Sequence, residues 1–96
     1  MPMKNPPHPG KILKGEIDEL GYSISQTAEL FGVTRQQLHR VVKGESSISA
    51  EMALRIETSI GGTADLWLRM QVAYDLAQLR LKTVTHAGYK TKKLVA

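Results

Sequence analysis

The sequence predicts an all-α fold of five helices, and three features of the chain lead to this prediction. Apolar residues recur at helical spacing in each successive segment, Ser or Thr stands where most segments begin, and glycine stands where they end. The turns between segments are too short for β crossovers. With 96 residues, 42% of them apolar, the chain can bury one modest core. We therefore expect one domain over residues 1–82 and a short extended basic tail over residues 83–96.

The first predicted helix spans residues 9–20, because Pro9 suits a first helical turn and a glycine that can adopt the left-handed conformation follows the last residue. The second helix is short. A capping box of Ser23 with Gln26 opens it, and Gly32 stops it.

A second capping box, Thr34 with Gln37, opens the third predicted helix, which ends at the next glycine. The second and third helices are joined by a three-residue turn, with the small residue Ala28 placed four positions before Gly32. These are the steric requirements of a helix-turn-helix, in which two short helices share an apolar face. The sequence therefore predicts a helix-turn-helix at about residues 23–44.

The third helix carries hydrogen-bond donors and positive charge but no carboxylate between residues 34 and 44. Arg can bind guanine and Gln can bind adenine through two hydrogen bonds each, and the N-terminal half of such a helix enters the major groove of DNA. The alternative is an ordinary solvated helix face, and His39 fits an incidental surface position equally well. We predict that this helix contacts DNA through Thr34, Arg35, Gln36, Gln37, His39, Arg40 and Lys43, and that the second helix offers a phosphate site at Ser23, Ser25 and Gln26.

A fourth helix follows Ser49, and a fifth follows Thr63 and runs to about residue 81. The fifth carries two apolar stripes, although a surface helix of a small domain needs only one. We expect the core stripe to contain Leu66, Trp67, Met70, Ala73, Tyr74, Ala77 and Leu81, with Gln71, Asp75 and Gln78 among the polar residues that divide the stripes. Because helix-turn-helix proteins read two half-sites through two-fold symmetry, we expect a homodimer. Its predicted interface is the second stripe, formed by Leu68, Val72, Leu76 and Leu79.

Two stretches of the chain, residues 34–44 and 80–96, carry only basic charges, within a net charge of +4. A polyanionic partner explains both, and a solvated face with a solubilising tail is the alternative. Thr83, Val84 and Thr85 favour extended structure, and glycine interrupts any helix soon after them. Such tails are usually disordered, and for this one we weigh a short strand or a docked extended arm against order that comes only from crystal packing.

Other classes of protein find little support. The chain has no cysteine, the start MPMKNPPHPG lacks the apolar run of a signal peptide, and no window approaches the ~18 apolar residues of a membrane span. We expect a soluble cytoplasmic protein with no membrane partner. The histidines at positions 8, 39 and 86 are far apart and lack clustered carboxylates, and no glycine-rich phosphate loop follows a strand. We therefore expect no enzyme, no metal and no cofactor.

Four segments of the chain, HPGKIL, FGVTRQQLHRVVKG, ISAEMALRI and LWLRMQVAYDLAQ, together resemble the HigA (VapI-like) antitoxins, a branch of the Xre/Cro-like helix-turn-helix proteins. The resemblance covers roughly residues 7–78. It implies a dimeric repressor of its own operon that binds double-stranded operator DNA and a HigB-type toxin, a ribosome-dependent RNase. The base-contacting positions of the family fall on Thr34, Arg35, Gln36 and Arg40, whereas Ile24 stands where many relatives carry a phosphate-binding Gln.

The main alternative is a stand-alone repressor, phage-like or metabolic, that has no toxin. A protein-binding module without DNA affinity is a second one. For the antitoxin we place toxin contact on the first and fifth helices, and we give the lysines of the tail an auxiliary role in DNA binding or dimerisation. A docking arm for the toxin and a solubilising tail are the other roles open to this tail.

Overall fold

The computed structural model describes residues 5–86, and over residues 83–86 it describes the backbone alone. These residues form five α-helices and no strand: α1 (Pro9–Leu20), α2 (Ile24–Phe31), α3 (Arg35–Val42), α4 (Ala50–Ser59) and α5 (Ala64–His86). The predicted all-α architecture is confirmed. In this part of the chain no helix is both long enough and apolar enough to cross a membrane.

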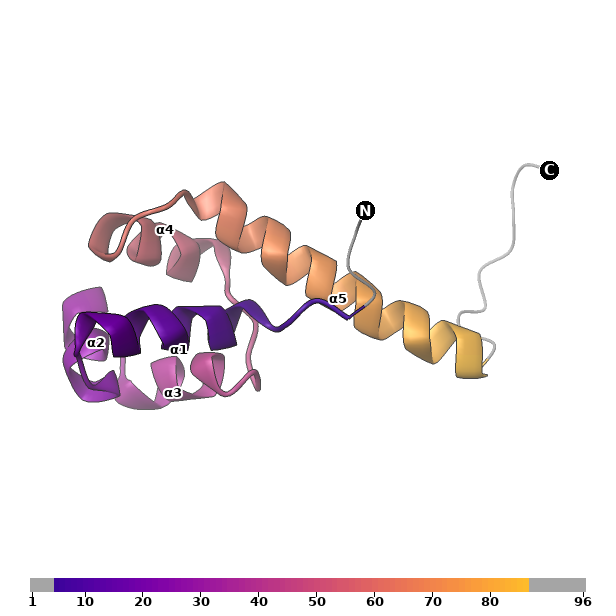
Figure 1. The fold of residues 1–96 in the computed structure, drawn as a ribbon, viewed down its shortest axis with the longest axis horizontal. Coiled ribbons are helices and arrows are strands. Elements are labelled where there is room, and N and C mark those ends of the chain that lie inside the picture. The colour runs from indigo at the N-terminus through magenta and orange to yellow at the C-terminus, as the bar shows by residue number, and fades with distance from the viewer. Residues whose placement is uncertain (1–4, 87–96) are drawn as a thin grey trace.

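α1 contacts α3 on one side and α5 on the other, α2 packs against α3 and α4, and α4 packs against α5 (Figure 1). The C-terminal half of α5 projects beyond the other four helices (Figure 1). One core joins all five helices and the loop before α4. Its most deeply buried apolar side chains are Leu13, Ile17, Leu38, Ile48, Ala53 and Ile56.

The helix starts are fixed by the residues that the sequence singles out. The hydroxyl of Ser23 accepts a hydrogen bond from Gln26 N (3.0 Å), and Ser23 N donates in return to Gln26 Oε1 (2.8 Å). Ser49 caps α4 by accepting from Met52 N at 3.1 Å. At the start of α5 the Glu57 carboxylate accepts from Ala64 N at 2.7 Å, which satisfies one of the free N–H groups of the first turn.

The predicted extended segment at residues 83–85 is wrong, because α5 continues without a break to His86. Adding a residue to an existing helix gains one hydrogen bond for each residue fixed, and the lower helix propensity of Thr and Val costs only about 0.7 kcal/mol per residue or less. A β-strand needs a partner strand for its backbone hydrogen bonds, and residues 5–86 contain none. The remaining predictions for the tail fall on residues 87–96, which lie outside the described residues.

The face of α5 that meets the core also differs from the prediction. Leu66 (49% exposed), Ala73 and Leu81 are exposed, whereas Gln71 is only 4% exposed. The buried face is centred on Trp67 and Gln71, because α5 must cover both α4 and the start of α1. Gln71 can lie there since its Oε1 accepts from Ile48 N at 2.8 Å. Periodicity alone assigns a polar residue to the surface, and it cannot reveal this long-range partner.

Candidate nucleic-acid interface

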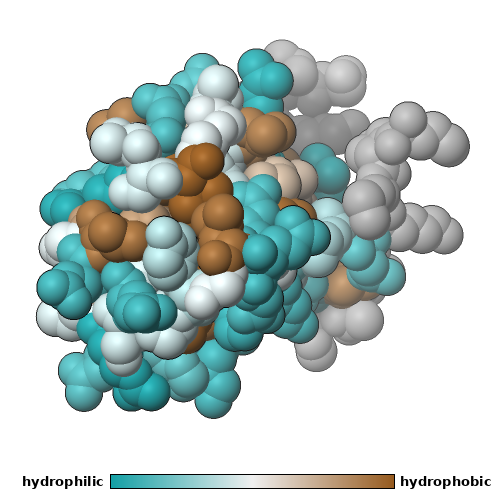
Figure 2. Space-filling view, turned by 60° about the vertical axis from the view of Figure 1, so that its left-hand side comes forward, coloured by the Kyte–Doolittle hydropathy of each residue, from teal (hydrophilic) through white to brown (hydrophobic). Residues whose placement is uncertain are grey.

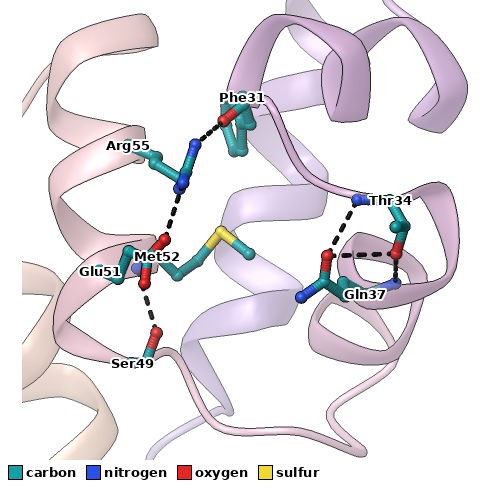
Figure 3. A network of polar contacts seen from close by, with 7 residues as sticks. All are labelled: Phe31, Thr34, Gln37, Ser49, Glu51, Met52 and Arg55. Atoms are coloured by element: carbon teal, nitrogen blue, oxygen red, sulfur yellow. Dashed lines mark hydrogen bonds and ion pairs between the residues drawn. The ribbon is translucent and has the colours of Figure 1, made fainter.

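The turn between α2 and α3 is held by contacts from within α2 and from α4. Gly32 adopts the left-handed conformation (φ 71°), and Val33 N donates to Ala28 O at 3.0 Å. Figure 3 shows Arg55 of α4, whose guanidinium donates both to the Phe31 carbonyl and to the Glu51 carboxylate. Arg55 therefore satisfies a backbone carbonyl at the end of α2 and fixes the turn from which α3 starts. No short-range pattern identifies this contact, because the two residues are 24 positions apart.

The segment His8-Pro9-Gly10 sets how closely α1 approaches α3. His8 is buried at the N-cap of α1, where its Nδ1 accepts from Gly10 N at 2.9 Å. A Cβ on Gly10 would lie 1.8 Å from the carbonyl oxygen of Val41, in the last turn of α3, so only glycine fits this contact. The packing of α1 thereby fixes the C-terminal end of α3.

His8 also contacts α5, because its ring meets the ring of Tyr74 edge-on with a centroid separation of 4.8 Å. Burial lowers the pKa of His8 below the usual 6.5; the carboxylate of Asp75 and a hydrogen bond with the backbone of Ser46 oppose this shift, while the charge of Lys11 adds to it. His8 thus joins α1, α5 and the loop after α3 as a neutral side chain. The sequence drew attention to His8 through the family resemblance and in the search for metal sites, but neither indicated this buried packing role.

The structure places α3 as predicted, with Leu38, Val41 and Val42 turned into the core. All seven residues predicted to contact DNA from Thr34 to Lys43 are exposed, and five of them form the surface that we call the α3 face: Arg35, Gln36, His39, Arg40 and Lys43. Among the described residues the ion pairs are Lys14 with Asp18 and Arg55 with Glu51, so no carboxylate pairs with a cation of the α3 face. Its basic donors are therefore available to an external acceptor.

The capping box of α3 divides the roles of its two glutamines (Figure 3). Thr34 Oγ1 accepts from Gln37 N at 3.0 Å, and Gln37 Oε1 accepts from Thr34 N at 3.0 Å. Two bonds to adenine require both the oxygen and the nitrogen of a Gln amide, and the cap already uses the oxygen of Gln37. Gln36 is exposed and keeps both groups, so it is the better candidate for this contact.

The other predicted phosphate site lies at the start of α2, where Ser23, Ser25 and Gln26 are exposed. Ser23 and Gln26 hold each other in the capping box, whereas the hydroxyl of Ser25 has no hydrogen-bond partner among the described residues. Ile24 is half-buried and packs against the core, so the position that carries a phosphate-binding Gln in the resembled family serves packing here. Within the described residues, no group of three or more His, Cys, Asp or Glu could hold a metal ion.

Comparison with known proteins agrees with this geometry. Residues 13–67 match the helix-turn-helix family. Virulence-associated protein A' of Dichelobacter nodosus is 40% identical over 78 residues, which cover 80% of this chain and 68% of that protein. An addiction module antidote protein of the HigA family from Coxiella burnetii is 30% identical with a TM-score of 0.82, over 93% of this chain and 98% of that one. The chain belongs to the HigA (VapI-like) branch of the Xre/Cro-like helix-turn-helix family.

Solved structures similar to this chain include complexes with DNA. The Pseudomonas aeruginosa antitoxin HigA, in a structure with the higBA promoter, superposes on this chain with a TM-score of 0.82 and 27% identity, over 95% of this chain and 100% of that one. This chain thus combines a HigA-like fold with an exposed α3 face whose cations form no ion pair among the described residues.

Proposed function

We propose that this protein is the antitoxin of a HigBA-type toxin–antitoxin system. In this role it neutralises a ribosome-dependent RNase toxin in the cytoplasm and represses its own operon by sequence-specific DNA binding. The observation that supports the proposal most directly is the α3 face, with basic donors and no compensating carboxylate, in a fold shared with a HigA solved on promoter DNA. The toxin part rests on family membership.

The DNA-binding step follows from the chemistry of the α3 face. Arg35, Gln36 and Arg40 are directed to base edges in the major groove, where Arg recognises guanine and Gln recognises adenine. Thr34 is placed to contact DNA with its methyl group, because its hydroxyl is held in the cap. Lys43, at the C-cap of α3, is assigned to a phosphate. The two capping boxes hold α2 and α3 in fixed conformations before DNA arrives, which lowers the entropy lost on binding.

Dimerisation is assigned to the outer face of α5. Val72 is 55% exposed and Leu76 is 42% exposed. Together with Leu68, Arg69 and Ala73 they line a shallow, mostly apolar groove of about 410 Å³. Leu68 also packs partly against the core, and Leu79 continues the stripe at 42% exposure. A two-fold axis through this face would bury the stripe against its copy and present two α3 faces to a palindromic operator.

The base-reading assignment is tested by comparing two substitutions on operator DNA and on random DNA. We expect Arg35→Ala to weaken operator binding by about 1 to 3 kcal/mol and to relax discrimination at one base position. Lys43→Ala should weaken binding to both DNAs by a similar factor, because a phosphate contact carries no sequence information. Fluorescence anisotropy at fixed salt measures both effects. Equal losses on operator and random DNA for Arg35→Ala would show that this residue does not read bases.

The dimer assignment is tested with the double variant Val72→Lys and Leu76→Lys. We expect a folded, soluble monomer, because both side chains lie on the exposed face of α5. The matched control places lysine at Leu30 and Leu54, which are also exposed but lie on α2 and α4, and it should remain a dimer. Sedimentation velocity and circular dichroism distinguish the outcomes. If the double variant remains a dimer, the interface does not lie on this face of α5.

Toxin neutralisation is tested by co-expressing the chain with the product of the neighbouring reading frame. Growth arrest by that product alone, relieved by this chain in a stable complex, is the expected result. If no neighbouring product is toxic while the operator is still bound in a sequence-specific manner, the protein is instead a stand-alone repressor. If the chain shows no salt-dependent DNA binding, the remaining interpretation is a protein-binding module.

A further inference from the structure

A groove of about 550 Å³ lies between α1 and the corner where α4 passes into α5. Its apolar walls come from both sides of the cleft, and two carboxylates stand at its rim. The residues that define it here are Ile12, Glu16, Glu19, Leu20, Leu66 and Met70. Three of the apolar side chains are well exposed: Leu20, Leu66 and, to a lesser extent, Ile12. Figure 2 shows apolar surface gathered at this end of the molecule and framed by hydrophilic residues.

Among the described residues, no cation forms an ion pair with the two rim carboxylates. In α1 the one described ion pair joins Lys14 to Asp18, and it leaves Glu16 and Glu19 unpaired. An apolar wall beside a carboxylate lowers the local dielectric, which strengthens the attraction of the carboxylate for a cation. The groove therefore favours a ligand that combines an apolar group with positive charge, and it disfavours a nucleic acid backbone.

The wall of the groove also contains a polar atom that has no hydrogen-bond partner among the described residues. Trp67 is 3% exposed, and its indole Nε1 is buried without a hydrogen-bond acceptor. It lies against Gly62, which lines the same groove and whose added Cβ would be 3.6 Å from Nε1. A buried donor left unpaired costs about 1–3 kcal/mol, and native proteins rarely leave one without a functional or structural reason. Because Nε1 itself is buried, a docked partner cannot reach it, and the unpaired donor adds only a cost to the free chain.

The position of the groove leaves the other two proposed surfaces free. α1 lies between the groove and α3, so the α3 face points away from it (Figure 1). On α5, Met70 lines the groove and Val72 belongs to the outer stripe. Two residues along a helix correspond to a rotation of about 200°, which places these side chains on nearly opposite sides. A molecule in the groove can thus be bound together with DNA and with a second copy of the chain.

We propose that this groove docks a basic segment of a protein partner, with an apolar side chain of that segment in the groove and flanking Lys or Arg residues on Glu16 and Glu19. The proposal rests on the proposed function only for the identity of the partner, which would be the toxin. The partner chemistry follows from the groove itself.

The chain provides its own probe for this test, because Trp67 is its single tryptophan and lines the groove. A short synthetic peptide of alternating leucine and lysine is titrated into the full chain, and a matched peptide carries glutamate in place of every lysine. We expect a saturable change in tryptophan emission with the lysine peptide and none with the glutamate peptide. No saturable change, or the same change with both peptides, would overturn the proposal.

Charge reversal at the rim separates a specific site from general attraction. We expect Glu16→Lys with Glu19→Lys to weaken binding of the lysine peptide by ~10-fold or more, because like charges then face each other. The control, Glu29→Lys with Glu45→Lys, makes the same change in net charge outside the groove and should alter binding by less than about 2-fold. Equal effects of the two double variants would refute a docking site in the groove.

The apolar wall is tested by a second pair of substitutions. Leu66→Gln should weaken binding of the lysine peptide. Leu54→Gln, at a similarly exposed position outside this groove, should leave that binding unchanged. Deleting residues 87–96 provides a further check, since these residues are themselves basic. Unchanged peptide binding supports an external partner. A ~10-fold gain in affinity after the deletion would show that the tail occupies the groove, and the external partner would be wrong.

A final arm uses the product of the neighbouring reading frame as the probe. Loss of its complex in the Glu16→Lys and Glu19→Lys variant, with operator binding retained, supports both the groove and the antitoxin function. A complex that survives the charge reversal would overturn the groove as its docking site. If the unmodified chain forms no complex, the proposed toxin neutralisation is wrong. The peptide titrations alone then show whether the groove binds a basic segment.

Discussion

Replacing Gly10 with alanine should destabilise the protein strongly, although alanine is normally the better helix residue. The new Cβ would lie 1.8 Å from the carbonyl oxygen of Val41 and 2.7 Å from its carbon. An unstrained contact needs about 3.5 Å, so the distance available is roughly half of what is required. Both atoms belong to the backbone of α3, and no side-chain rotation can relieve the clash.

Relief therefore requires α1 and α3 to move apart by more than an ångström at their closest point. Such a shift disturbs the contacts of Leu13, Ile17 and Leu38, which are almost completely buried between these helices. Overpacking of a core typically costs about 1–3 kcal/mol, and the upper end applies here because the backbone must move. For a domain of this size that loss corresponds to a fall of roughly 10–20 °C in melting temperature.

Gly15 provides a matched control in the same helix. A Cβ on Gly15 would meet nothing within 4 Å. Gly15→Ala should therefore stabilise the protein by about 0.5–1 kcal/mol, the usual gain for alanine inside a helix. The two substitutions change the same atoms and should act with opposite signs.

Urea unfolding followed by circular dichroism, at one fixed chain concentration, measures both free energies. Operator binding well below the melting temperature adds a functional readout, because Val41 lies in the last turn of α3. A Gly10→Ala variant within about 0.5 kcal/mol of the unmodified protein would refute the close approach of α1 to α3. A destabilised Gly15→Ala variant would instead question the helical packing of α1 as a whole.

Two further predictions concern buried polar groups of α1 and α5. Gln71→Leu should lower the free energy of unfolding by about 1–3 kcal/mol, because it leaves the buried Ile48 N–H without an acceptor. The control Gln78→Leu should change this free energy by about 0.5 kcal/mol or less. Thermal melts measure both variants, and similar losses would contradict the role of Gln71. Because burial lowers the pKa of His8, the unfolded chain binds more protons than the folded chain just below pH ~6.5. The contribution of His8 to stability should therefore be full above that pH and should be lost as the pH falls from ~6.5 through the lowered pKa of the folded state. Urea unfolding at a series of pH values measures this dependence, and His8→Asn should flatten it.

The sequence by itself determined the features that depend on neighbours a few residues apart. The two capping boxes, the start of α4 at Ser49 and the left-handed glycine after α1 are hydrogen bonds or backbone conformations within one helical turn. They need no other part of the chain, and they were predicted with the right residues. The inward turn of Leu38 and Val41, and with it the exposed α3 face, also follows from local helical spacing.

Other features were decided only by the tertiary structure. The partner of Gln71 lies 23 residues away and that of Arg55 lies 24 away, so neither the buried face of α5 nor the support of the turn can be read from spacing. The need for glycine at position 10 exists only because the backbone of α3 lies against it. Local β propensity favoured an extended segment after residue 82, but α5 continues through it. Lengthening an existing helix by a few residues costs less free energy than starting a strand that has no partner strand. The sequence determined where each helix begins and which face of α3 is free, and packing between distant segments decided the rest.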